Sequence, residues 1–226
     1  MYQQYKTERE WFEILLTNTP ESMKIKWRLD NNHHVIRNHF AETGGLRSCV
    51  RQAADAFSVE PQTDEFCERL KEVHPKALHM LAKHGIEYWP FLWQERPSVE
   101  PRLGACYPNA YRHMYANNLV SRERGSDLRM VYVEGIGVAS RMILHAWNAL
   151  DVHCDMAIDI TWYAMTGWYF YLGIPLTEDE FKKAQRLVYG DKEYCQLFSR
   201  SAYPKIESYL EDLLSARKEA KQTEAA

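Results

Sequence analysis

A block of strand-like patterns between residues 130 and 172 most constrains the fold, because the segments around it have helical patterns. The run from Met130 to Gly135 is rich in β-branched and aromatic residues and closes on a glycine, as strands often do. Strands are predicted at 130–135, 138–148, 156–163 and 168–172. Strands gathered in one block, with helices before and after, favour an α+β fold with an antiparallel sheet of about four strands.

Helical patterns occupy both ends of the chain. Apolar residues recur at helix-like intervals from about residue 7 to residue 95, and Thr177 to Glu180 form a capping-box start for a C-terminal helix. A shorter helix is predicted from Cys106 to about Asn117, packed on the sheet and followed by a charged loop at 121–127. We expect a helical N-terminal region (1–100) for substrate recognition or as a lid, a catalytic core (101–176), and C-terminal helices with a frayed tail (177–226).

Composition narrows the classes of partner and compartment. The formal net charge of -3 gives no basic field for nucleic acid. The N-terminus has no apolar signal region, and no stretch approaches about 18 consecutive apolar residues, so we expect neither secretion nor a membrane partner. The five cysteines are odd in number and widely scattered, without a C-x-x-C pair, which favours reduced thiols in the cytoplasm.

Three residues carry the strongest chemical signal in the chain. Cys106, His145 and Asp159 follow one another in the order of a nucleophile, its base and the carboxylate that orients the base. Cys106 is predicted to begin a helix, where the helix dipole and a nearby imidazolium both favour the thiolate. The sequence therefore predicts a thiol catalytic site.

A hairpin explains how the last two of these residues meet. A turn centred on Val152 places His145 opposite Asp159 on one face of the sheet, with Cβ atoms about 4.5–5.5 Å apart. That distance allows a hydrogen bond from the imidazole Nδ1–H to the carboxylate. Asp155 is the competing carboxylate, but the same pairing places it near the turn, facing Ala149, so we prefer Asp159.

Further residues are candidates for binding substrate or an oxyanion. The backbone N–H of Cys106 is one expected oxyanion donor, and Gln94 and Asn109 are alternatives for the second. Gly104 suits a tight turn or a close approach of substrate backbone. Trp147 lies on the same face as His145, where it shields the imidazole, lines a groove or simply packs in the core.

A metal site is the alternative use of the same three residues. Cysteine, histidine and carboxylate are acceptable zinc ligands, but a thiol at a helix start opposite a His–Asp strand pair suits a triad better. His74, His79 and His84 are spaced by five residues, which scatters them around a helix axis. We expect no metal and no cofactor.

The motifs resemble those of a known group of enzymes. The segment from Gly104 to Tyr107 resembles the papain-type nucleophile signature, Gly-[Ser/Ala]-Cys-[Trp/Tyr]. The separation of 39 residues between Cys106 and His145, the His-Ala-Trp motif and the Asp159-x-Thr161 element are similar to the transglutaminase-like branch of papain-like thiol enzymes. The resemblance covers about residues 101–175 and implies Cys106 as nucleophile, His145 as base and Asp159 as the orienting carboxylate.

The resemblance implies acyl transfer through a thioester. The expected substrate is a protein, a peptide or a small molecule with an amide bond, and peptidase, amidase, deamidase and transglutaminase reactions share the first half-reaction. We favour hydrolysis, because no acidic pocket for a second amine is evident. The alternative is a catalytically inactive scaffold that serves as a protein-binding module.

Overall fold

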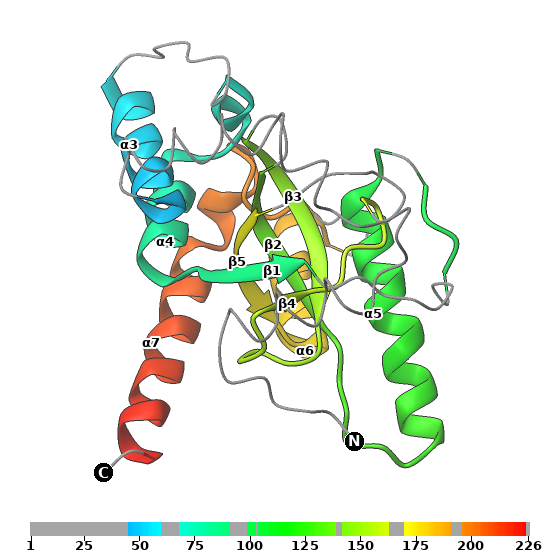
Figure 1. Cartoon of the computed structure of the whole chain (residues 1–226). Helices are drawn as coiled ribbons and strands as arrows, with labels where there is room; N and C mark the ends of the chain where they lie inside the picture. Colours follow the sequence, from blue (N-terminus) through cyan, green and yellow to red (C-terminus); the bar gives the residue numbers. More distant parts are fainter. Residues whose placement is uncertain are drawn as a thin grey trace.

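The structure is a computed structural model in which a curved sheet lies among helices (Figure 1). It describes residues 45–59, 68–90, 99–102, 104–138, 142–162, 170–190 and 196–224. In the view of Figure 1, helix α5 (Cys106–Glu123) is drawn to the right of the strands, and helices α3 (Leu46–Val59) and α4 (Pro75–His84) are drawn to the left.

Five strands form one sheet in the order β3-β2-β5-β1-β4. The strands are β1 (Ile86–Pro90), β2 (Val131–Val138), β3 (Met142–Ala149), β4 (Met156–Ala157) and β5 (Phe170–Leu176). The first four strands in this order pair antiparallel, and only the two-residue β4 pairs parallel, with β1. The α+β fold and the antiparallel sheet of about four strands are thus confirmed.

The sheet curls until its two ends meet. Asn148 on β3 pairs with Ile158, which directly follows β4 at the opposite end of the strand order, and their backbones exchange two hydrogen bonds of 3.0 and 2.7 Å. This pairing differs by two residues from the predicted hairpin, which had Asn148 opposite Met156. Consequently Asp159 does not lie directly across from His145 but follows the last paired residue.

Each face of the sheet has its own core. One face carries an aromatic cluster supplied mainly by the strands, whose largest members are Tyr88, Trp147, Trp162 and Tyr171. The other face packs against helices from both ends of the chain in one large core. Besides α3, α4 and α5 these helices are α6 (Glu178–Tyr189) and α7 (Glu207–Glu224), with short 3-10 turns at Glu68–Glu72 and Tyr203–Lys205.

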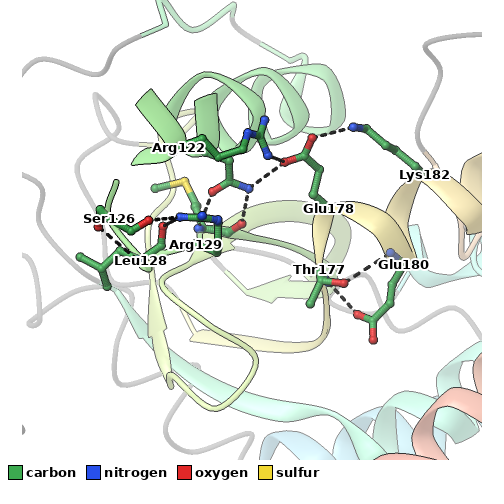
Figure 2. Close-up of polar contacts among 10 residues, drawn as sticks. Arg122, Ser126, Leu128, Arg129, Thr177, Glu178, Glu180 and Lys182 are labelled. Atoms are coloured by element: carbon green, nitrogen blue, oxygen red, sulfur yellow. Dashed lines mark hydrogen bonds and ion pairs between the residues drawn. The ribbon is translucent and has the colours of Figure 1, made fainter. Parts of the chain in front are cut away.

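The C-terminal end of α5 is fixed to the sheet and to α6. The Asn118 amide donates to Met130 O at 2.9 Å, and its oxygen accepts from Met130 N at 2.7 Å, at the entry to β2. Glu178, in the first turn of α6, accepts from Arg122 at 2.9 Å and from Lys182 at 2.6 Å (Figure 2). These contacts hold the last turn, so α5 continues past the predicted end near Asn117 into the predicted loop.

Two predictions for the flanking regions had different outcomes. The capping box at Thr177 is confirmed, with the hydroxyl accepting from Glu180 N and the Glu180 carboxylate accepting from Thr177 N. The prediction of helix up to residue 95 is wrong for 86–90, which form β1. Tyr88 there pairs with Tyr171, so the N-terminal region supplies a strand of the sheet. The parts of that prediction before residue 45, at 60–67 and at 91–95 lie outside the described residues.

In the part of the chain that the structure describes, no helix combines the length and apolarity needed to span a membrane.

Candidate active site

The structure brings Cys106, His145 and Asp159 together from three different elements. Cys106 is the first residue of α5, His145 lies in the middle of β3, and Asp159 lies in the turn that follows β4. His145 Nε2 donates to Asp159 Oδ2 at 2.6 Å, and Cys106 also acts on the imidazole, where it raises the pKa of the ring. The side chains of His145 and Asp159 are only 1% and 6% exposed, so the pair is shielded from water.

The imidazole has the opposite orientation to the predicted one. The sequence predicted Nδ1 as the donor to the carboxylate, but the donor is Nε2. Asp159 approaches from the turn beyond the Asn148–Ile158 pairing rather than from a strand position across from His145. The carboxylate therefore holds Nε2, and Nδ1 is the ring nitrogen left for another partner.

The Asp159 carboxylate accepts four hydrogen bonds. Its Oδ1 accepts from the backbone N–H groups of Thr161 at 2.9 Å and Trp162 at 3.1 Å. Its Oδ2 accepts from His145 Nε2 and, at 3.0 Å, from the hydroxyl of Tyr171 on β5. Two backbone donors on one oxygen fix the plane of the carboxylate, and the other oxygen is directed at the imidazole.

Electrostatics favour the protonated form of His145. Burial alone lowers the pKa of this imidazole, but the charge and hydrogen bond of Asp159, with those of Cys106, outweigh burial and raise the pKa to about 9. At neutral pH His145 is therefore an imidazolium between a carboxylate and the sulfur. A cation at this position stabilises a thiolate and carries a proton that a leaving group can take.

Aromatic rings enclose the imidazole. Trp162 stacks on His145 with ring centroids 3.9 Å apart and an angle of 14° between the planes. Gly137 on β2 makes this possible, because a Cβ there would lie 2.8 Å from Trp162 Cη2 and 3.1 Å from His145 Cβ. The Trp162 ring thus excludes water from one face of the His–Asp pair.

Trp147 has a packing role. Its centroid lies 6.2 Å from that of His145, but the ring is buried in the aromatic cluster, 4.8 Å from Tyr171. Its benzene edge lies over Gly173, where an added Cβ would approach within 2.6 Å. Of the three predicted roles, the packing role fits this burial, and Trp147 is also stacked near the imidazole, at 20° to its plane, although Trp162 makes the closer stack.

Hydrogen bonds fix the start of α5 against β3 and the Asp159 turn. The hydroxyl of Tyr107, next to Cys106, donates to the carbonyl of Leu144, next to His145, at 3.0 Å. The amide of Asn148 on β3 donates to Ala110 O at 3.0 Å. Since both contacts lie within four residues of Cys106, they set the position of the thiol relative to the imidazole.

The side chain of Asn109 binds groups of the protein itself and does not fit the predicted role of oxyanion donor. Its amide group donates to Arg102 O at 2.8 Å and to Thr161 Oγ1 at 3.0 Å, and its oxygen accepts from Arg102 N at 3.0 Å. Both amide hydrogens are therefore used. The side chain is buried and ties the segment before Cys106 to the turn that holds Asp159.

The remaining predicted binding residues have different placements. Gly104 is exposed with φ +72°, a left-handed conformation that suits the tight turn before α5. No side-chain cap closes the start of α5 at Ala105, and among the described residues the N–H of Cys106 has no acceptor. This N–H is thus the available oxyanion donor. Gln94, the other candidate, lies outside the described residues.

Across the described ranges, no three histidine, cysteine, aspartate or glutamate side chains are grouped to hold a metal ion. The three site residues instead use their polar atoms on one another and on Thr161, Trp162 and Tyr171. A zinc ion would have to displace these hydrogen bonds.

Sequence reasoning missed several members of the site. Trp162 and Thr161 lie in the motif that starts at Asp159, so the sequence contained a signal for them. It contained no signal for the stack of Trp162 on the imidazole. Tyr107 lies in the predicted nucleophile motif next to Cys106, but the motif does not indicate its hydrogen bond to Leu144. Tyr171 gives no local signal, because it reaches Asp159 only through the pairing of β5 in the sheet.

Comparisons with known proteins give no match: no family model, no curated protein and no solved structure is similar to this chain at a significant level.

Proposed function

We propose that this protein is a thiol-dependent acyl-transfer enzyme that cleaves an amide bond through Cys106, His145 and Asp159. The observation that carries the proposal is the buried hydrogen bond of 2.6 Å between His145 and Asp159, with a cysteine at a helix start that acts on the same imidazole. Neither a packing role for a lone cysteine nor a surface ion pair requires this combination.

The proposed reaction has two steps. The Cys106 thiolate attacks the carbonyl carbon, and the N–H of Cys106 stabilises the oxyanion. The C–N bond then breaks as His145 gives its Nδ1 proton to the leaving amine, which leaves a thioester on the sulfur. In the second step His145 takes a proton from water and the resulting hydroxide attacks the thioester; the C–S bond breaks, the carboxylic acid leaves, and the sulfur returns to the thiolate beside the protonated imidazole.

Hydrolysis is the favoured outcome of the second step. An amine acceptor in place of water would complete a transamidation by the same residues. Protein, peptide and small amide substrates all present the reacting carbonyl that the site requires. Since cysteines that are odd in number and scattered favour a reducing compartment, we place the reaction in the cytoplasm.

Thiol reactivity tests the proposal without knowledge of the substrate. The rate of alkylation by iodoacetamide is measured at each cysteine by peptide mapping from pH 5 to pH 9, in the unmodified protein and in His145→Ala. Cys154 is the internal reference, because burial raises the pKa of its thiol. His153→Ala is the matched control, since this histidine is exposed in the turn at the end of β3.

We expect Cys106 to be alkylated at pH 6 much faster than Cys154, and His145→Ala, but not His153→Ala, to remove that advantage. A substrate screen with amide libraries then follows. If Cys106 reacts no faster than Cys154 and His145→Ala changes nothing, the thiol is not activated. That outcome supports the alternative of an inactive scaffold with a role in binding proteins.

A further inference from the structure

Tyr171 is a candidate fourth member of the site, reached by none of the sequence motifs. Its hydroxyl donates at 3.0 Å to Asp159 Oδ2, the same oxygen that accepts the proton of His145 Nε2. The backbone donors of Thr161 and Trp162 both bind the other oxygen. Tyr171 is therefore the side chain that shares the reactive oxygen of Asp159 with the imidazole.

The fold delivers this hydroxyl from a distant strand. Tyr171 on β5 pairs with Gly137 on β2 and with Tyr88 on β1, and its side chain is buried in the aromatic cluster. The ring lies 4.8 Å from Trp147 and 5.8 Å from Trp162. A phenylalanine ring would make the same packing contacts, so packing alone does not require the hydroxyl.

A neighbouring tyrosine shows that burial in this cluster does not by itself give a tyrosine hydroxyl a hydrogen-bond partner. Tyr88, directly opposite Tyr171 in the sheet, is equally buried, but its hydroxyl has no hydrogen-bond partner among the described residues. The aromatic cluster thus contains two buried tyrosines with different surroundings, and only the hydroxyl of Tyr171 is directed at the site.

A hydroxyl donor at Asp159 Oδ2 acts on the base. The positive end of the O–H dipole lies beside the carboxylate oxygen that attracts the His145 proton, so it offsets part of that attraction. An imidazole held too strongly as the cation is a poor acid for a leaving amine. The titratable groups that act directly on His145 are Asp159 and Cys106, and this hydroxyl reaches the imidazole only through Asp159 Oδ2.

We infer that Tyr171 is a positioning residue of the candidate active site, which holds Asp159 Oδ2 against His145 and limits how tightly the imidazole keeps its proton. The inference rests on the proposed function, because it assigns Tyr171 an effect on the acid that protonates the leaving group. It extends the triad to a hydrogen-bonded series of four side chains, from the sulfur to the tyrosine hydroxyl.

The test compares Tyr171→Phe with Tyr88→Phe. Each change removes one buried hydroxyl from the same aromatic cluster and retains the ring. The titration of the His145 imidazole is followed by NMR with labelled histidine, assigned with His145→Ala. The alkylation profile of Cys106 is measured in parallel. We expect Tyr171→Phe to move the His145 titration upward by roughly half to one pH unit, and Tyr88→Phe to leave it in place.

The outcomes separate this inference from the proposed function. An unchanged His145 titration in Tyr171→Phe, or equal shifts in both variants, would overturn the role of the hydroxyl, because only packing would then be affected. The proposed function fails on a different result, which is a Cys106 of the unmodified protein that alkylates no faster than Cys154. If Cys106 is activated and only Tyr171→Phe moves the titration, both are supported.

Discussion

Replacing Asp159 by asparagine tests the His–Asp pair most directly. The side-chain oxygen of asparagine can still accept from the backbone of Thr161 and Trp162, so the turn is retained. The amide nitrogen then faces His145 and donates, which forces Nε2 to accept. The ring of the variant is then neutral, with its single proton on Nδ1, and in this tautomer the imidazole cannot take the thiol proton.

The size of the effect follows from the pKa of His145. The pair raises this pKa from 6.5 to about 9, and each unit corresponds to about 1.4 kcal/mol, so the protonated pair stabilises the fold by about 3 kcal/mol. Because the folded-state pKa lies above the unfolded value, this stabilisation is complete below pH 6.5 and disappears as the pH rises through 9. The stability difference between the protein and Asp159→Asn should therefore be largest near pH 6.

Urea denaturation at pH 6 and pH 10 measures this difference. Asp155→Asn is the matched control, because Asp155 is an exposed carboxylate between the turn and β4. We expect the loss of stability in Asp159→Asn to shrink by about 3 kcal/mol between the two pH values, and Asp155→Asn to show no such change. Because the imidazole of Asp159→Asn can no longer take the thiol proton, alkylation of Cys106 at pH 6 should be slower in this variant than in the unmodified protein.

Two results would refute the reasoning. One is a stability loss in Asp159→Asn that is the same at pH 6 and pH 10, which would mean that His145 does not gain its proton from the pair. The other is rapid alkylation of Cys106 at pH 6 in Asp159→Asn, which would mean that the thiol is ionised by something other than the imidazolium.

Two further predictions concern the sheet. Gly137→Ala places a methyl group 2.8 Å from the Trp162 ring, so we expect a stability loss of about 1–3 kcal/mol. The near-UV circular dichroism spectrum should change, and alkylation of Cys106 should become slower. An unchanged spectrum would contradict the stack of Trp162 on His145. Burial raises the pKa of Glu134 from 4.5 to about 8, so the folded protein binds the extra proton and loses stability as the pH rises through that range. In Glu134→Gln the side chain can still bind the Tyr132 hydroxyl and the two backbone N–H groups that Glu134 binds. The melting temperature should therefore differ less between pH 5 and pH 9 in this variant than in the unmodified protein.

The order and spacing of the site residues were predictable, because nucleophile, base and carboxylate each have a recognisable chemical type. The contacts that these residues make in the fold were only partly predictable. The turn between β3 and β4 was located correctly, but the pairing of Asn148 with Ile158 shifts the strands by two residues. Side-chain alternation cannot detect a shift of two, since it keeps every side chain on the same face. The error appears in which imidazole nitrogen meets Asp159.

Long-range pairing explains the other misses. Residues 86–90 follow α4 closely and read as its continuation, whereas their strand conformation depends on β5, far along the chain. The length of α5 depends likewise on Asn118 and Arg122, whose partners Met130 and Glu178 come later in the sequence. Local propensity carries no information on such partners.

The position of β1 between β5 and β4 has a consequence for how the molecule is assembled. The β2–β3 hairpin and the turn that carries Asp159 are close in sequence, so during folding His145 can find its carboxylate early. The sheet becomes continuous only when β1, from the N-terminal half, enters between two elements that are synthesised later. Because non-local contacts of this kind form slowly, we expect β1 to join the sheet late on the folding pathway. Only then is the aromatic cluster complete, so the His–Asp pair is shielded from water at the end of folding.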